Sequence, residues 1–414
     1  MAHSNTPASP FVAIPDGGGA TVHVRVMING KFKANPRLFV RNDGADASEL
    51  LGGTVEETQV EKTEYPALCF LIEKEKDDGS VERIMFDLGL RKDPTQYSKL
   101  TNDTVVPYFT PCGNCNDVAE NLALGNLTPS DIHCVILSHD HFDHCGDPLL
   151  FPESTRFELG DFGTDDESLR QMECLDATLT TPASCQDNIS LSLSANSTAL
   201  PVAARALKHC HYESTVSLVL EESMELRSAS KAQSFIFPQY LSWRRLLKDK
   251  LVIWQSLGAF DRAFDYFGDG SFWILDAPGH CQGHIMAMAR TTAFPCTYIL
   301  FASDAAHAKC LYSPVNNPAT GQPQRRSFGV YADGYACDAR LPRPNTVHED
   351  VPVAYQTVER LTQMEALDNV FVIAAHETEI EQVVDMFPLY ANKWYEKGWK
   401  AKTKEAMLKV ENGT

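Results

Sequence analysis

Residues 139–144 read HDHFDH and bring three histidines and two aspartates into six positions. One residue, Ser138, separates them from the run DIHCVIL, which predicts a short buried strand. Because side chains alternate along a strand, His139 and His141 should point to the same side and hold one metal ion. Asp143 and His144 can then hold a neighbouring ion. Imidazole and carboxylate ligands suit zinc better than an all-oxygen cage would, so this stretch predicts a zinc site.

Three further stretches with ligand-type side chains also follow apolar runs. The run FWIL leads into residues 276–284 (DAPGHCQGH), the run YILFA leads to Asp304, and the run NVFVIA leads to His376. A ligand at the end of a strand is held by rigid backbone, which metal coordination requires. Four such strand ends in one chain predict one composite site.

The rest of the chain supplies the elements that would position these residues. Residues 77–79 (Asp-Asp-Gly) form a turn signal between two apolar runs and predict a β-hairpin. Residues 351–367 have the apolar spacing of a helix. Strands are predicted at residues 21–27, 67–74, 81–88, 131–137, 154–159, 272–275, 298–302 and 369–374.

Residues 162–234 interrupt this alternation of strands and helices. They are polar, and residues 176–200 are rich in Ser, Thr and Asn, which indicates an insertion or a mobile connection. Residues 235–267 then become aromatic. Two interpretations of this second stretch stay open: a helical pair packed on the core, or an apolar wall or lid over a substrate pocket.

Composition limits the class of partner. The chain has 414 residues, with 36 Lys and Arg against 55 Asp and Glu, so its formal net charge is −19. Such a surface repels phosphate backbones, which argues against a nucleic acid partner. No charged and apolar leader and no run of about 18 apolar residues is present, so we expect neither a signal peptide nor a membrane span. The 12 cysteines are mostly isolated, which is typical of reduced thiols and predicts a cytoplasmic location.

Taken in order along the chain, the motifs HDHFDH, APGHCQGH, FASD and AAHE resemble those of the metallo-β-lactamase superfamily. The first motif is specific, whereas the other three are weak alone and strong in this order. The resemblance reaches from about residue 20 to residue 390, apart from residues 162–234. Within the superfamily, the chain is most similar to the N-acyl homoserine lactonases and to related fungal lactamases and lactonases.

This resemblance implies an α+β fold, an αβ/βα sandwich in which two mixed sheets are flanked by helices. We expect a flexible leader over residues 1–19 and a metallo-β-lactamase-like domain over residues 20–400. The domain would carry an insertion at about 162–267, as a lid, a dimer contact or both, and residues 401–414 would form a tail. A homodimer is the expected assembly if the insertion is a contact.

The resemblance also implies a binuclear site with two Zn²⁺ ions per chain. In the family, the first histidine of the G-H-x-x-G-H stretch is the ligand, which selects His280 over His284. Asp87 matches a family aspartate that supports the site, since metal-bound histidines usually donate their other N–H to a carboxylate or carbonyl. The implied ligands are His139, His141 and His280 for the first ion, Asp143, His144 and His376 for the second, and Asp304 as the bridge.

Such a site implies hydrolysis by a hydroxide that bridges the two metals and attacks the carbonyl of a cyclic amide, carbamate or ester. Metal binding supports this attack because it lowers the pKa of water from 15.7 to about 7. One zinc would polarise the carbonyl oxygen and the other would hold the leaving atom, while Asp143 orients the hydroxide or relays its proton. We therefore expect a metal-dependent hydrolase, of lactamase or lactonase type, with a small cyclic substrate.

The sequence departs from the lactonase pattern three residues after Asp304. The family tyrosine that hydrogen-bonds the substrate carbonyl is replaced here by His307. A histidine can donate a hydrogen bond to an oxyanion and a proton to a leaving nitrogen. This favours an amide- or carbamate-like ring, as in fungal γ-lactamases that open benzoxazolinone-type heterocycles. His307 is therefore a candidate catalytic residue together with Asp143, and Tyr312 is the alternative.

Two other interpretations stay open. A glyoxalase II-like thioesterase shares the metal motif, but it normally has a basic C-terminal substrate patch, which TKEAMLKVENGT does not resemble. A non-catalytic metal-binding scaffold would tend to lose ligands, whereas all seven ligand positions are filled here. A count of two zinc ions per chain would favour the enzyme, and a count of zero would favour the binding protein.

Overall fold

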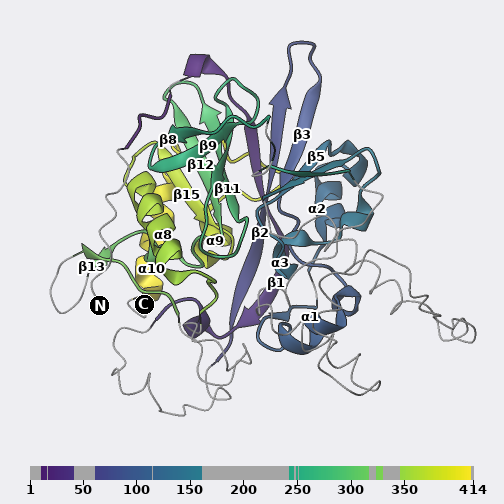
Figure 1. Ribbon diagram of the computed structural model, residues 1–414, viewed down its shortest axis with the longest axis vertical. Helices are drawn as coiled ribbons and strands as arrows, with labels where there is room; N and C mark the ends of the chain where they lie inside the picture. The colour runs from purple at the N-terminus through teal and green to yellow at the C-terminus, as the bar shows by residue number, and fades with distance from the viewer. Residues whose placement is uncertain are drawn as a thin grey trace, which may run out of the picture.

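The computed structural model describes residues 11–15, 17–41, 61–113, 115–160, 242–246, 249, 251–316, 323–329 and 346–411. Within this part of the chain, two large β-sheets pack against each other, as Figure 1 shows. Short strands β13 and β14 form a separate ribbon at Val315–Asn316 and Pro323–Gln324. None of the helices in the described residues combines the length and apolar character that crossing a membrane requires.

The first sheet is mixed. In the described residues its strands lie in the order β4-β1-β2-β3-β5-β6-β7, antiparallel from β4 to β3 and parallel from β3 to β7. The predicted hairpin at residues 77–79 joins β2 to β3, which rise together in Figure 1. The strands are β1 (His23–Ala34), β2 (Thr63–Glu75), β3 (Val81–Phe86), β4 (Thr110–Pro111), β5 (Cys134–Leu137), β6 (Arg156–Leu159) and β7 (Ser242–Arg245).

The second sheet is also mixed. Its described strands lie in the order β15-β12-β11-β10-β9-β8, and only the β12–β15 pair among them is parallel. The strands are β8 (Gln255–Leu257), β9 (Phe260–Asp265), β10 (Phe272–Asp276), β11 (Ile285–Thr292), β12 (Thr297–Ser303) and β15 (Val370–Ala374). The predicted strands at 272–275, 298–302 and 369–374 therefore all belong to this sheet.

The inner core lies between the two sheets. Phe70 of β2 and Phe301 of β12 stack across it with ring centroids 4.0 Å apart. Each fully buried side chain of this size contributes about 1.5–3 kcal/mol to folding. Successive residues of β2 serve opposite faces, since Phe70 enters the inner core and Leu71 enters an outer cluster.

Helices cover the outer face of each sheet. α2 (Val118–Leu124) contributes Leu122 to the cluster outside the first sheet, and α8 (Val351–Glu365) contributes Leu361 to the cluster outside the second. In Figure 1, α1 and α2 lie beside the first sheet, whereas α8 and α10 lie beside the second. The predicted α+β class, an αβ/βα sandwich of two mixed sheets, is thereby confirmed. The other α-helices of the described residues are α1 (Lys99–Thr104), α3 (Phe142–Cys145), α9 (Thr378–Val383) and α10 (Trp399–Glu411).

The aromatic stretch at 235–267 forms strands where it is described, not the helical pair that was one interpretation. β7 extends the first sheet, and β8 and β9 extend the second. Phe264 of β9 packs on the inner core, and Tyr266 and Phe267, which follow the strand, pack on the same core. The expected insertion at about 162–267 therefore includes residues of both sheets from 242 onward, while residues 161–241 lie outside the described part.

The two ends of the domain also differ from expectation. Residues 399–411 form helix α10, whose Met407 is buried, where a tail from residue 401 was expected. In the expected leader, Tyr298 Oη donates to Pro15 O at 2.6 Å, and Val12 pairs with Gly258. These contacts attach both segments to the side of the domain that carries the second sheet. The expectation differed because no short sequence pattern reveals such apolar and backbone contacts.

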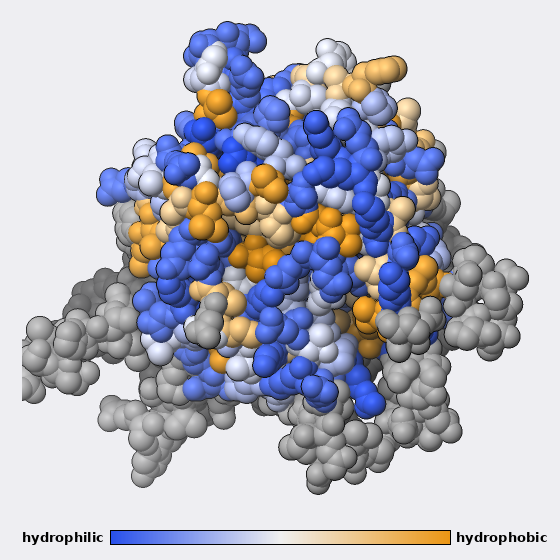
Figure 2. All heavy atoms as spheres, turned by 180° about the vertical axis from the view of Figure 1, so that it is seen from behind, coloured by the Kyte–Doolittle hydropathy of each residue, from blue (hydrophilic) through white to orange (hydrophobic). Residues whose placement is uncertain are grey.

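The surface is largely polar. Figure 2 shows hydrophilic residues over most of the face opposite to Figure 1, with a band of hydrophobic residues across its middle. The chain has more acidic than basic residues, so some acidic side chains lack a basic partner. Unpaired charged side chains stay in contact with water, which agrees with this polar surface.

Candidate metal centre

The carboxyl ends of β5, β10, β12 and β15 meet at one edge of the sandwich. Backbone hydrogen bonds hold these ends together: Ile285 N donates to Ser138 O at 2.9 Å, and Ala375 N donates to Ser303 O at 3.1 Å. The structure brings all seven predicted ligands to this edge and buries each of them: His139, His141, Asp143, His144, His280, Asp304 and His376.

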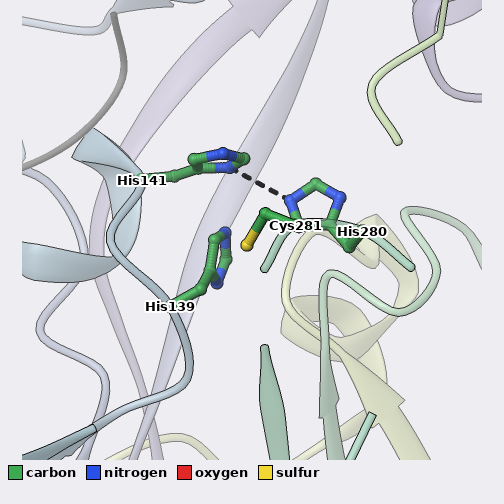
Figure 3. Close-up of side chains that lie close together, drawn as sticks. All are labelled: His139, His141, His280 and Cys281. Carbon is green, nitrogen blue, oxygen red and sulfur yellow. Dashed lines mark hydrogen bonds between the residues drawn. The ribbon is translucent and has the colours of Figure 1, made fainter. Parts of the chain in front are cut away.

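Figure 3 shows the first group of side chains, in which His139, His141 and His280 face one another and Cys281 lies beside them. His280 Nε2 lies 3.0 Å from His141 Nδ1, and the ring centroids of His139 and His141 are 4.4 Å apart. One ligand atom from each of the four residues lies within 4.8 Å of the others. The end of β5 and the loop after β10 therefore form one compact set of donors.

Asp304 lies between this group and a second one. Its Oδ2 atom is 3.4 Å from His280 Nε2 and 3.7 Å from His139 Nε2. Its Oδ1 atom is 3.2 Å from His144 Nε2 and 3.1 Å from His376 Nε2. Each carboxylate oxygen thus faces a different set of histidines.

Asp143 completes the second group. Its Oδ2 atom is 3.5 Å from His376 Nε2, and its Oδ1 atom is 3.9 Å from His144 Nε2. Asp143 and His144 share the short helix α3, whereas His376 comes from the end of β15. Adjacent residues of one chain segment therefore face one common position.

Hydrogen bonds behind the histidines fix their orientation. Asp87 Oδ2 accepts from His144 Nδ1 at 2.9 Å, and Asp87 Oδ1 accepts from Ser138 N at 2.7 Å. His376 Nδ1 donates to Pro66 O at 2.8 Å. Asp87 has a φ of 62°, a conformation that costs of order 1–3 kcal/mol for a non-glycine residue and persists where surrounding contacts enforce it. Asp87 therefore has the supporting place that the sequence predicted.

The histidines of the first group are neutral near pH 7. Burial lowers the pKa of His139 and His280 well below the ordinary value, and it lowers the pKa of His141 to about 3. A neutral imidazole offers a lone pair, which is the form that binds a metal ion.

The second group is arranged around negative charge. Burial alone would lower the pKa of His144 and His376, but the surrounding carboxylates, Asp304 foremost, together outweigh it and raise the pKa of both. Burial alone would raise the pKa of Asp304, but His144 and His376 hold it well below its usual range. A bound cation would take the place of the protons on these rings.

His307 lies at the site, and Tyr312 does not. His307 Nε2 is 3.1 Å from Asp304 Oδ2, and its ring stacks on Phe39 with centroids 4.8 Å apart. Tyr312 Oη instead lies within hydrogen-bonding distance of Glu377 and of Val372 O in a buried cluster. The Tyr312 hydroxyl is therefore engaged with Glu377 and Val372, whereas His307 faces Asp304.

Sequence reasoning missed His348, which lies against the back of His280. The two Nδ1 atoms are 3.3 Å apart, and His348 is 3 % exposed. Glu349 N donates to His280 O at 2.8 Å, which joins this segment to the loop after β10. No apolar strand precedes His348 and no second histidine follows it at ligand spacing, so no local pattern marked it.

The donors present fit zinc. Within the described residues, His139 Nε2 and His141 Nε2 have no hydrogen-bond partner although both rings are buried. A buried polar atom left without a partner costs about 1–3 kcal/mol, and a cation would remove this cost. Imidazole and carboxylate are ligands that zinc prefers in proteins, so the two groups match two such ions.

Comparison with protein families agrees with this site. A model of the metallo-beta-lactamase superfamily matches residues 63–160, which run from β2 to the residue after β6 and include HDHFDH. The resemblance inferred from the motifs is thereby confirmed, and the chain carries a metallo-beta-lactamase superfamily domain.

Curated relatives include longer proteins and a lactamase. Cytochrome P450 monooxygenase mpaDE of Penicillium brevicompactum is 28% identical over 410 residues, which are 97% of this chain and 39% of that protein. The chain thus spans well under half the length of the first such relatives. Gamma-lactamase FDB1 of Fusarium pseudograminearum (strain CS3096) is 28% identical over 359 residues, which are 81% of this chain and 72% of that protein.

A solved structure of an N-acyl homoserine lactone hydrolase has the product N-hexanoyl-L-homoserine bound at its catalytic metal centre. It is 15% identical to this chain with a TM-score of 0.49, and the match covers 90% of this chain and 99% of that one. Among the curated relatives, the gamma-lactamase agrees with the expected similarity to hydrolases of the lactamase type.

Proposed function

We propose that this chain, which carries a metallo-beta-lactamase superfamily domain, is a two-zinc hydrolase that opens a cyclic amide, carbamate or ester. One observation carries the proposal: the buried carboxylate of Asp304 turns one oxygen toward His139 and His280 and the other toward His144 and His376. Such an arrangement suits two cations that share one bridging ligand.

When bound, two zinc ions would supply Lewis acidity and lower the pKa of coordinated water from 15.7 to about 7. The chain's own residues hold the remaining roles. Asp304 sets the spacing of the two donor groups. The Asp143 carboxylate faces His376 from the second group and can accept a proton from the attacking water. Asp87 holds His144 from behind and keeps its Nε2 directed at the site.

His307 is proposed to act on the substrate's carbonyl oxygen or leaving nitrogen. Its Nε2 faces Asp304, and its Nδ1 is buried with no hydrogen-bond partner among the described residues. A ring nitrogen in this position can donate a hydrogen bond or a proton to a reacting atom. A donor to nitrogen favours a lactam or carbamate ring, and the name of the relative FDB1, a gamma-lactamase, supports the same choice.

The substrate is proposed to be a small neutral ring and not a nucleic acid. The net charge of −19 opposes phosphate backbones, and the donors at the site are buried beneath the edge of the sandwich. A homodimer and a cytoplasmic location remain predictions.

Hydrolysis of a substrate panel by the zinc-loaded full chain tests the proposal. The panel holds an acyl homoserine lactone, a benzoxazolinone, a simple γ-lactam, a β-lactam and a glutathione thioester, with Asp304→Ala as the control. Activity on a cyclic amide, carbamate or ester that the control lacks is the expected result. Activity on the thioester alone would replace ring opening by a glyoxalase II-like function.

Turnover and zinc content together separate the enzyme from a scaffold. Two zinc ions per chain without turnover of any ring would favour a non-catalytic metal-binding protein. A chain that binds no zinc would contradict the proposed centre itself.

The choice of His280 over His284 gives a matched pair of variants. Both histidines are buried on the same loop, but His284 belongs to none of the metal-compatible groups among the described residues. His284 Nδ1 donates to Ala277 O at 2.9 Å, which is a contact within its own loop. We expect His280→Ala to lose about one zinc per chain and His284→Ala to keep both, as measured by elemental analysis after dialysis. The opposite pattern would reverse the assignment.

A further inference from the structure

Cys281 lies in the first donor group without a role in the proposed reaction. It follows His280 in the loop after β10 and is 4 % exposed. Figure 3 shows its sulfur turned toward His139. The sulfur and one ring nitrogen each of His139, His141 and His280 lie within 4.8 Å of one another.

Two observations indicate that this sulfur faces a cation position. Within the described residues, no hydrogen bond connects Cys281 Sγ to any partner, although the residue is buried. The same region holds His139 Nε2 and His141 Nε2, two buried ring nitrogens that also lack a partner. Buried donors without partners, set beside the His141 and His280 rings whose facing nitrogens are 3.0 Å apart, are what a metal position presents before the ion binds.

We propose that Cys281 supplies a thiolate ligand to the same cation as His139, His141 and His280. This assignment rests on the proposed two-zinc function and specifies one of its two positions. Binding breaks the S–H bond and releases its proton to solvent while the sulfur lone pair forms the bond to the metal, so no oxidant or reductant takes part.

Adjacent ligands on one ion are feasible in this fold. Asp143 and His144 are neighbours in sequence and face one position in the second group. His280 and Cys281 repeat that relation in the first group. The loop therefore needs no long-range rearrangement to present both side chains.

The thiolate would make the two positions unequal. Both positions share the Asp304 carboxylate. Three imidazoles and one sulfur beside it favour zinc or cobalt, whereas the second group, which adds the Asp143 carboxylate and no sulfur, accepts harder cations more readily. We therefore infer that the ion held with Cys281 exchanges more slowly than its neighbour.

Cobalt substitution of the full chain tests the assignment without relying on turnover. Cobalt(II) bound to a thiolate shows an intense sulfur-to-metal charge-transfer band in the near ultraviolet, which nitrogen and oxygen ligands do not give. We expect the band in the unmodified chain, its loss in Cys281→Ser, and its retention in Cys145→Ser. Cys145 is a matched control because it is buried next to His144 while its sulfur contacts the backbone oxygen of His139 at 3.7 Å.

The outcomes separate this assignment from the proposed function. If the unmodified chain binds two cobalt ions per chain and shows no such band, the thiolate ligand is disproved and the two-metal centre stands. A band that survives in Cys281→Ser also overturns the assignment. If no cobalt binds, both the assignment and the proposed function fail. The absence of the band from the unmodified chain is decisive without any variant, so misfolding of Cys281→Ser cannot hide a negative result.

Discussion

Asp304→Asn is expected to lower ring hydrolysis by more than about 100-fold, because even the outer partners of metal ligands are worth about 10–100-fold. The substitution keeps the shape of the side chain but removes its negative charge and one anionic oxygen. Asp304 faces His280 with one oxygen and His376 with the other, so both donor groups lose their common partner. The measurement is kcat/KM on the most active ring of the panel, together with zinc per chain.

Asp276→Asn is the matched control for this prediction. Asp276 also stands at the end of a strand of the second sheet, but it pairs with Arg262 at 2.6 Å and not with the donor groups. A partly exposed pair of this kind contributes about 0–1 kcal/mol to stability. We expect the control to keep its zinc and its activity. Equal losses in the two variants would show that Asp304 acts only through folding.

Lys309→Met is expected to lower the free energy of unfolding by about 3–5 kcal/mol, the usual cost of breaking a buried ion pair from one side. Lys309 is 0 % exposed, and its Nζ lies 3.5 Å from Glu377 Oε2 and 3.0 Å from Tyr312 Oη. Burial alone would lower the pKa of Lys309, but the charge of Glu377 and its acidic neighbours outweighs it and raises the pKa. The ammonium therefore stays charged, and its removal leaves an acidic cluster without its cation.

Urea unfolding of the metal-free chain measures this effect, followed by the fluorescence of buried tryptophans such as Trp394. Lys92→Met is the control, because Lys92 pairs with Glu120 at the surface and such pairs contribute about 0–1 kcal/mol. Adding Glu377→Gln to Lys309→Met should recover part of the loss, since it removes the unpaired charge. A loss in Lys309→Met no larger than in the control would mean that this buried ion pair does not stabilise the fold.

The sequence by itself determined the parts of this protein that depend on local patterns. Apolar runs placed β5, β10, β12 and β15, and the ligand-type residues directly after them identified the candidate donors. This works because a buried strand requires continuous apolar residues, and because a donor placed at its end is held by rigid backbone. The hairpin of β2 and β3 and the helix α8 followed from equally short signals.

Only the tertiary structure decided which donors face one another. His280 and His284 give equally strong local signals in the sequence. Only His280 meets His141, which lies 139 positions earlier in the chain. His348 and Cys281 gained their positions from the packing of separate loops, and Tyr312 was turned away by its buried partner Glu377. Contacts of this range depend on how two sheets close on each other, and no periodicity within one segment encodes them.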